Sequence, residues 1–160
     1  MKEELFGGWG IDWEIFSWII SHLPKGSTIL ELGSGKSSAE LNRYYNLLSV
    51  EHAEHYIGMY DTNYIYAPYE TIPPNEKSWY KLDSVPKYDL LLIDGPDHSL
   101  RINILNHMEL FDWSKPVIID DVQEADLLTM ATTIANKYCK RTCSIHGGDY
   151  KDAKQFMVIE

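Results

Sequence analysis

Residues 28–38, which read TILELGSGKSS, decide the fold of this 160-residue chain. The first five residues form a short apolar run, and two closely spaced glycines, Gly33 and Gly35, follow. A short apolar run that enters a glycine turn is typical of a buried strand leading into a helix. The turn is tight, and it brings backbone N–H groups close to a ligand. The stretch therefore predicts the first strand and a binding turn of an α/β fold.

Apolar runs of similar length recur along the chain and alternate with segments of helical spacing. The runs lie at residues 47–51, 64–67, 90–94 and 117–120. The apolar stripes with helical spacing lie at residues 15–23, 100–111 and 127–138. The expected N-caps of these helices are Asp12, Ser99 and Asp121. Because the runs lack polar alternation, they suit strands buried on both faces. The pattern predicts a doubly wound, mostly parallel sheet with helices on both faces, a three-layer α/β/α architecture.

The last two strand-like runs, residues 139–145 and 155–159, differ from the others in their connection. The segment that joins them contains His146-Gly147-Gly148-Asp149 and is too short for a helical crossover. We therefore expect an antiparallel C-terminal hairpin at one edge of the sheet.

One segment breaks the alternation of strands and helices. Residues 68–86 contain Pro73-Pro74 and are expected to form a long loop with one short turn of helix. The length of the chain suits one domain, so residues 1–160 are predicted to form a single domain that begins with an N-terminal helix segment, residues 1–26.

Composition and charge are those of a globular domain with an acidic surface. Hydrophobic residues make up 44% and charged residues 24% of the chain, which excludes a disordered or collagen-like protein. The 24 Asp and Glu residues exceed the 14 Lys and Arg residues, and the formal net charge is −10. Because this charge repels phosphate groups, we expect no general binding to nucleic acid or to an anionic membrane.

Several features favour a cytoplasmic protein. Residues 1–4 include two acids and precede no apolar run of the kind found in signal peptides. The most apolar window, residues 15–23, is short and interrupted by polar residues, so it is not expected to cross a bilayer. Cys139 and Cys143 lack the spacing of a metal-ligand pair and are expected to be reduced thiols.

Glycine and carboxylates stand at the predicted carboxyl ends of the strands, where open α/β sheets bind their ligands. The residues at these ends are Gly33, Glu51, Ala67, Asp94 and Asp120. Glu51 lies 18 residues after Gly33, close to the spacing of the acid that accepts hydrogen bonds from ribose hydroxyls in dinucleotide-binding folds. The simpler alternative is a tight turn beside a solvated glutamate.

The glycine turn also has a P-loop-like ending. Residues 33–37 resemble the end of that motif, and residues 90–94 resemble a Walker B strand. The full motif, G-x-x-x-x-G-K-[ST], needs glycine at the position of Leu30, which lies inside the predicted strand. An NTPase or a dehydrogenase is therefore kept as a less favoured alternative.

The order and spacing of the motifs resemble the S-adenosylmethionine site of class I methyltransferases. The stretch ILELGSGKSS is similar to the first motif, ELGSGxST, of one broad branch. The block YAPYE…WYKLDSVPKYDLLLIDGP…R resembles the third- and fourth-strand block of that branch, and VIIDDV resembles its fifth strand. The resemblance extends from about Ile29 to Val122. It implies a Rossmann-like transferase, a methyltransferase that uses S-adenosyl-L-methionine.

The resemblance also implies a set of cofactor-binding residues. They are Glu31, Gly33, Ser34, Gly35, Ser37, Ser38, Glu51, His52, Ala67, Pro68 and Asp94. In this assignment Glu51 holds the ribose hydroxyls, and His52 lies next to the adenine. The chain departs from the family pattern twice: Ser38 replaces the third glycine of a dinucleotide-type turn, and residues 113–116 replace the usual Pro-Gly-Gly before the fifth strand. The second departure leaves the geometry of that loop open.

Asp94, His98 and Asp120 are the candidate catalytic residues at this edge. Methyl transfer from a sulfonium is an in-line displacement that depends on alignment, with a base when the acceptor is a hydroxyl. His98 follows the fourth strand closely enough to reach over the methyl group. The alternative is an ordinary surface histidine at the start of a helix.

Asp94, Asp120 and Asp121 form a predicted metal site at the same edge. Three neighbouring carboxylates repel one another unless a cation or protons intervene, and their oxygens suit Mg²⁺ or Ca²⁺. The alternative is that Asp121 caps a helix while Asp94 serves the cofactor.

The acceptor is expected to be a small molecule or a glycan-like compound, methylated on oxygen or nitrogen. Five aromatic residues near the third strand offer a stacking surface, or alternatively pack at the edge of the core: Tyr64, Tyr66, Tyr69, Trp79 and Tyr80. Neither nucleic acid nor a membrane is an expected partner, and a homo-oligomer is considered. The alternative to an enzyme is a non-catalytic S-adenosylmethionine-binding or partner module of the same fold.

Overall fold

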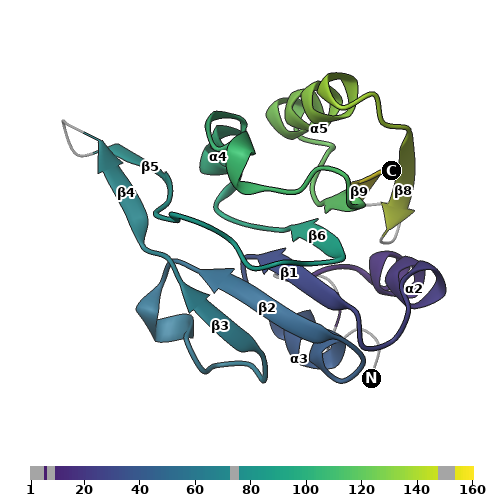
Figure 1. Cartoon of the computed structure of the whole chain (residues 1–160), viewed down its shortest axis with the longest axis horizontal. Coiled ribbons are helices and arrows are strands. Elements are labelled where there is room, and N and C mark those ends of the chain that lie inside the picture. Colours follow the sequence, from purple (N-terminus) through teal and green to yellow (C-terminus); the bar gives the residue numbers. More distant parts are fainter. Residues whose placement is uncertain (1–5, 7–9, 73–75, 148–153) are drawn as a thin grey trace.

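The computed structural model describes residues 6, 10–72, 76–147 and 154–160 of the chain. Its main feature is a seven-stranded sheet in the order β3-β2-β1-β6-β7-β9-β8 (Figure 1). The strands are β1 (Thr28–Leu32), β2 (Asn46–Glu51), β3 (Asn63–Tyr66), β6 (Leu90–Ile93), β7 (Val117–Ile119), β8 (Thr142–Gly147) and β9 (Lys154–Ile159). Pairs among the first five strands of this order are parallel, whereas β9 pairs antiparallel with both β7 and β8. The predicted fold class and the hairpin at one edge are confirmed; Gly148 and Asp149 of the joining segment lie outside the described residues.

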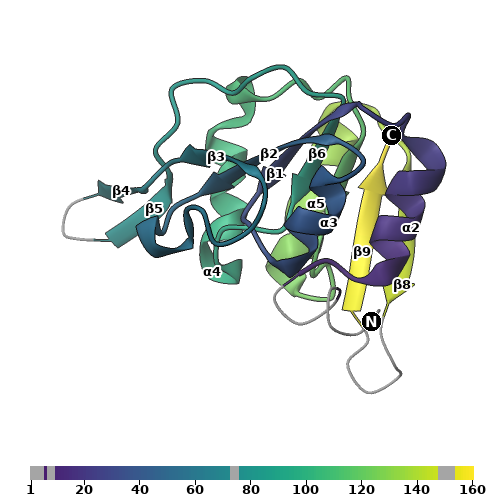
Figure 2. The ribbon, with the colours of Figure 1, turned by 90° about the horizontal axis from the view of Figure 1, so that it is seen from below.

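Helices cover both faces of the sheet. Figure 1 places α2 (Trp13–His22) and α3 (Lys36–Asn42) on one side, and α4 (His98–Arg101) and α5 (Ala125–Lys137) on the other. Figure 2, seen from the first side, has α2 and α3 in front of the strands. The apolar strand residues divide between the two layers: Ile29 packs in the cluster that contains α2, and Leu30 in the cluster that contains α5. This division confirms the three-layer arrangement.

The helix expected across residues 100–111 is interrupted. The chain forms only the single turn of α4, followed by two 3-10 segments, η2 (Ile102–Asn106) and η3 (Met108–Leu110). Ile104, Met108 and Phe111 are still buried, so the apolar pattern predicted the face but not the type of helix. Residues with low helix propensity, Asn103, Asn106 and His107, lie before or between them.

Two of the three expected N-caps are wrong. Asp12 occupies the N-cap position of α2, although its side chain makes no capping hydrogen bond. Asp97 rather than Ser99 precedes α4, and Glu124 rather than Asp121 precedes α5. Asp121 has φ of 61°, a left-handed conformation, whereas N-cap residues are usually extended. The helix therefore begins after the turn that contains Asp121.

Within the segment 68–86, two strands form a β-hairpin, in contrast to the expected long loop with a turn of helix. Strands β4 (Tyr69–Ile72) and β5 (Glu76–Tyr80) pair antiparallel and project from the main sheet (Figure 1). Residues that favour strands, among them Tyr69 and Trp79, lie on both sides of the prolines, so the prolines separate two strands. Residues 73–75 lie outside the described part of the chain. A short 3-10 segment, η1 (Glu54–Tyr56), follows β2.

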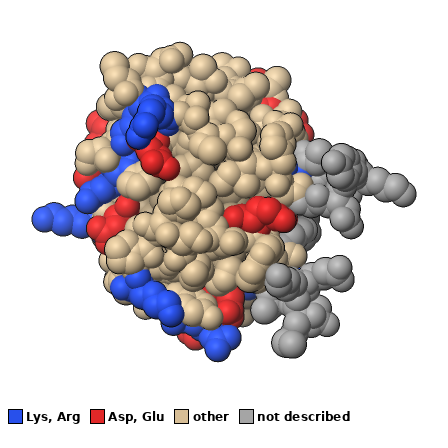
Figure 3. Space-filling view, turned by 90° about the vertical axis from the view of Figure 1, so that its right-hand side faces the viewer, with Lys and Arg blue, Asp and Glu red and all other residues tan. Residues whose placement is uncertain are grey.

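The structure tests only some of the remaining predictions, which concern membrane spans, surface charge, location, partners and oligomeric state. Among the described residues, no helix combines the length and the apolar character needed to cross a bilayer. On the face that carries the C-terminal hairpin, charged side chains of both signs are scattered over a mostly uncharged surface (Figure 3). This face therefore presents no continuous acidic field despite the net charge of −10. Cytoplasmic location, partners and oligomeric state stay predictions.

Candidate functional site

A cavity of about 700 Å³ lies at the carboxyl ends of the parallel strands. The register aligns these ends, because Leu32 of β1 is paired with Val50 of β2 and with Ile93 of β6. The predicted site residues that line the cavity are Gly33, Ser34, Gly35, Glu51, His52, Asp94, His98 and Asp121. The edge predicted from the strand pattern thus contains a real cavity, and it gathers most of the predicted residues.

The glycine turn is shaped by the close approach of two backbones. Gly33 has φ of 89°, and a Cβ placed on it would lie 3.1 Å from the Cα of Gly95. Glycine is therefore required at residue 33 for conformation and for space. The turn then enters α3, where the Gly35 N–H donates to the Ser38 hydroxyl (2.9 Å). The predicted tight turn at the start of a helix is confirmed.

Glu31 lies beneath this turn rather than on the cavity wall. Its carboxyl is almost completely buried and accepts hydrogen bonds from the hydroxyls of Ser38 (2.8 Å) and Ser49 (2.6 Å). Burial raises the pKa of Glu31 to about 8, although both hydrogen bonds oppose the shift. Glu31 connects the turn to β2, which differs from the expectation that it lines the cofactor site.

Glu51 holds the opposite side of the turn. Its Oε1 accepts the backbone N–H groups of His52 (2.8 Å) and Ala53 (3.1 Å), and its Oε2 accepts the hydroxyl (2.8 Å) and the backbone N–H (3.3 Å) of Ser34. The side chain is only 3% exposed, yet it lines the cavity. The carboxylate is therefore fixed in orientation and available to a ligand that displaces the Ser34 hydroxyl.

Other predicted cofactor residues do not line the cavity. The buried Ser37 hydroxyl accepts the backbone N–H of Ile11 (3.2 Å), and Ser38 serves Gly35 and Glu31. Ala67 is fully buried and Pro68 is exposed, and neither is a lining residue. Ser37 and Ser38 thus support the turn.

The three predicted metal ligands come together. One side-chain oxygen from each of Asp94, Asp120 and Asp121 lies within 4.8 Å of the others. Burial, followed by the charge of Asp94, raises the pKa of Asp120 well above its ordinary value. Asp120 is therefore expected to be protonated, which disfavours it as an ionised base. Asp120 also does not line the cavity, so the candidate catalytic role predicted for it is not supported by its position.

Asp121 is occupied by other partners. Its Oδ2 accepts hydrogen bonds from Arg101 (3.3 Å) and pairs with His98 Nε2 (2.9 Å), and its Oδ1 accepts the amide of Gln123 (3.1 Å). Burial opposes ionisation of Asp121, but the Arg101 charge and the Gln123 hydrogen bond hold its pKa below the ordinary value. This donor set does not fit a site in which all three carboxylates bind one cation, because Asp121 already neutralises Arg101.

We therefore expect no Mg²⁺ binding by the wild-type protein. Calorimetric titration of Mg²⁺ in the presence of S-adenosylhomocysteine is expected to give no saturating heat at millimolar ion, since Arg101 and His98 take the oxygens of Asp121. A saturating heat that disappears in Asp94→Asn would contradict this expectation and restore the predicted metal site.

His98 is the predicted catalytic residue that best fits the cavity. It starts α4, lines the cavity, and its side chain is 55% exposed. Because Nε2 faces the carboxylate of Asp121, the tautomer with hydrogen on Nε2 is favoured, and Nδ1 is the nitrogen left to accept a proton. The pair has the arrangement of a base held by an orienting acid.

Two of the lining residues that the sequence analysis did not assign to the site are Arg101 and Lys154. Arg101 is 3% exposed and donates to the carbonyl oxygens of Asp94, Pro96 and Asp120 as well as to Asp121. Arg101 follows the fourth strand within the block LLLIDGP…R, and this motif is the only local feature of the sequence that points to it. Lys154 begins a strand that is distant in the sequence, and no local motif points to it. Of the predicted aromatic cluster only Tyr80 lines the cavity, while Trp79 is fully buried in the core.

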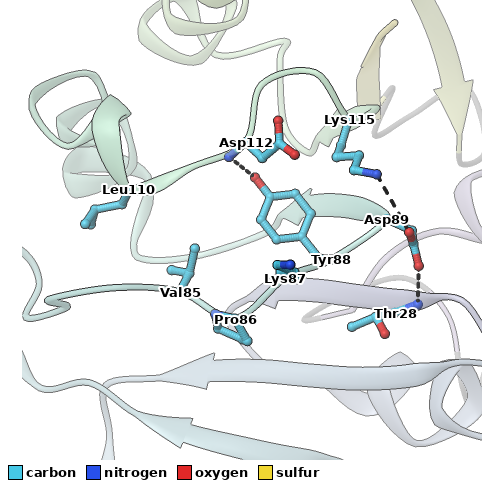
Figure 4. A pocket seen from close by; sticks show the side chains of 9 residues that line it. All are labelled: Thr28, Val85, Pro86, Lys87, Tyr88, Asp89, Leu110, Asp112 and Lys115. Carbon is cyan, nitrogen blue, oxygen red and sulfur yellow. Dashed lines mark hydrogen bonds and ion pairs between the residues drawn. The ribbon is translucent and has the colours of Figure 1, made fainter.

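A second cavity of about 470 Å³ lies at the opposite, amino-terminal edge of the strands. Its polar groups are largely paired with one another (Figure 4): Asp89 accepts the Thr28 N–H (2.9 Å), and the Tyr88 hydroxyl accepts the Asp112 N–H (2.7 Å). Lys115 lies 3.9 Å from Asp89. This edge offers no comparable set of convergent groups.

Comparisons with known proteins agree with this architecture. A scan against models of protein families and a search of curated protein sequences found no match. Among solved structures, the chain is similar to a precorrin-6y C5,15-methyltransferase from Geobacter metallireducens (14% identity, TM-score 0.65, 99% of this chain and 94% of that one). It is also similar to an O-methyltransferase from Bacillus cereus in complex with SAH (12% identity, TM-score 0.63, 90% of this chain and 78% of that one). The fold is that of the Rossmann-like class I methyltransferases.

Proposed function

We propose that the protein transfers a methyl group from S-adenosylmethionine to a small-molecule or glycan-like acceptor, on oxygen or nitrogen. One observation carries the proposal: the glycine turn, Glu51 and Asp94 line a single cavity at the carboxyl edge of the sheet. Ligands of open α/β folds bind at this edge. The similarity of the fold to those of solved methyltransferases also supports the proposal of methyl transfer.

In this proposal Glu51 binds the ribose. A ribose hydroxyl that donates to the carboxylate takes the place of the Ser34 hydroxyl on Oε2, because that side chain can rotate away, whereas the His52 and Ala53 N–H groups on Oε1 are fixed by the backbone. The Gly33 turn allows the backbone to approach the ligand closely, and His52 lines the cavity beside Glu51.

The chemical step needs alignment more than covalent assistance, since the sulfonium is itself an activated donor. His98 is proposed as the base that takes the proton of a hydroxyl or amine acceptor at Nδ1, while Asp121 orients the ring through Nε2. Asp94 lines the same cavity and is proposed to contact the cofactor or the acceptor. No step is assigned to a metal ion.

The direct test is ligand binding. A thermal-shift panel of S-adenosylmethionine, S-adenosylhomocysteine, ATP and NAD is expected to stabilise the protein with the first two only. Glu51→Ala is expected to weaken S-adenosylhomocysteine binding at least tenfold by calorimetry, because a charged hydrogen-bond acceptor for the ribose is lost. Glu54→Ala is the matched control, since Glu54 is exposed and does not line the cavity.

Other outcomes separate the alternatives. Stabilisation by ATP or NAD alone would favour an NTPase or a dehydrogenase. Equal binding by wild type and Glu51→Ala would remove the proposed ribose site. Binding of S-adenosylmethionine without formation of S-adenosylhomocysteine on any acceptor would favour a non-catalytic module.

A further inference from the structure

The Tyr80 hydroxyl is a buried polar group without a described hydrogen-bond partner. Tyr80 is 1% exposed, and no described residue donates to its oxygen or accepts from it. Buried hydroxyls normally have a partner, because an unpaired one loses its hydrogen bonds to water without replacement. An exception in a folded protein therefore needs an explanation.

This hydroxyl lies at the end of β6, beside glycines that line the cavity, and its oxygen is itself buried. A Cβ placed on Gly95 would lie 2.6 Å from it, so the hydroxyl occupies the space that glycine leaves open where β6 ends. Gly95 in turn packs against Gly33 of the binding turn. Tyr80 also lines the cavity, so its ring reaches the point where the two glycine backbones meet.

The ring of Tyr80 is held in place by other aromatic groups. Its centroid lies 5.4 Å from that of Trp79 and 5.9 Å from that of Tyr69, both from the β4–β5 hairpin. His52, which stacks on Tyr69 with centroids 4.1 Å apart, lies 6.4 Å away. Because the ring is packed on these sides, the hydroxyl keeps its direction while it lacks a partner. A polar group fixed in this way is preorganised for a ligand.

We propose that the Tyr80 hydroxyl, which the β4–β5 hairpin brings to the strand ends, is a hydrogen-bonding contact to the adenosyl part of the cofactor. The inference rests on the proposed function for the identity of the ligand. Burial keeps the phenol protonated, because it raises the pKa of Tyr80 well above its ordinary value. The hydroxyl is then a donor for a neutral acceptor such as a ribose oxygen or a purine nitrogen.

The test is Tyr80→Phe, which removes the hydroxyl and keeps the ring. The free protein is expected to melt about 2–4 °C higher, because an unpaired buried group is removed. Binding of S-adenosylhomocysteine is expected to weaken roughly 5- to 10-fold by calorimetry. Adenosine is expected to show the same loss, whereas methionine is not.

Tyr88→Phe is the matched control. Tyr88 is also buried, but its hydroxyl accepts the Asp112 N–H at the opposite edge of the sheet (Figure 4). This variant is expected to melt lower than wild type and to bind S-adenosylhomocysteine with unchanged affinity. The two tyrosines therefore separate a ligand contact from a structural hydrogen bond.

Each combination of binding affinity and melting temperature for Tyr80→Phe either supports or overturns the proposal. Weaker binding with a raised or unchanged melting temperature supports the proposal. Unchanged or tighter binding overturns it while the proposed function stands. Weaker binding with a lowered melting temperature assigns the hydroxyl a structural role and also overturns it. If wild type binds neither S-adenosylmethionine nor S-adenosylhomocysteine, the proposed function and this inference fall together.

Discussion

Arg101→Met is expected to lower the melting temperature by roughly 10 °C, the largest loss of stability at the site. The guanidinium is 3% exposed and is the common donor to Asp121 and to the carbonyl oxygens of Asp94 and Pro96. Without the guanidinium, the buried carboxylate of Asp121 loses a neighbouring positive charge, and the carbonyl oxygens lose a hydrogen-bond donor. Breaking a buried pair on one side destabilises by about 3–5 kcal/mol.

The control is Arg43→Met at the exposed C-terminal end of α3. Arg43 pairs with Glu40 (2.9 Å), but its side chain is 69% exposed, and such exposed pairs contribute little to stability. Differential scanning calorimetry of both variants measures the contrast. Equal, small shifts would show that Arg101 is not needed to hold the strand ends together, and would reopen Asp121 as a metal ligand.

The parts of the fold that were predictable depend on local sequence. The first strand was predicted with its observed bounds, Thr28–Leu32, and Gly33 was placed correctly in the turn, because both are defined by adjacent residues. The parallel core and the antiparallel edge followed from connection lengths. The β4–β5 hairpin was missed because Pro73-Pro74 was taken as a sign of irregular structure.

The candidate site was predictable only in part, since side-chain roles depend on distant partners. Glu31 was expected on the cavity wall, but Ser49 of the neighbouring strand holds its carboxyl below the turn. Asp121 was considered as a cap or a metal ligand, whereas Arg101, 20 residues earlier, accounts for its charge. Tyr80 was expected only as a member of an aromatic cluster, for stacking or for packing at the edge of the core, because the strand that carries it was not predicted.

Glu31→Gln is expected to stabilise the protein strongly at alkaline pH and little at pH 5. The carboxyl is buried, and its pKa is raised from 4.5 to about 8. Between these values the unfolded chain releases the proton while the folded chain keeps it, so stability falls as the pH rises. A shift of this size corresponds to roughly 5 kcal/mol lost by pH 8.

Glutamine cannot ionise, so this loss disappears in the variant. Its amide oxygen remains an acceptor for the hydroxyls of Ser38 and Ser49, which preserves the contacts beneath the turn. The measurement is urea unfolding of wild type and variant at pH 5 and pH 8.5, with the exposed Glu54→Gln as control. A gain that is equal at both pH values would contradict the assignment of a buried, protonated Glu31, because only ionisation makes the difference depend on pH. A gain confined to alkaline pH means that wild type keeps the Glu31 carboxyl neutral beneath the glycine turn. A negative charge on Glu31 would repel the nearby carboxyl group of Glu51 and would destabilise the arrangement around the turn.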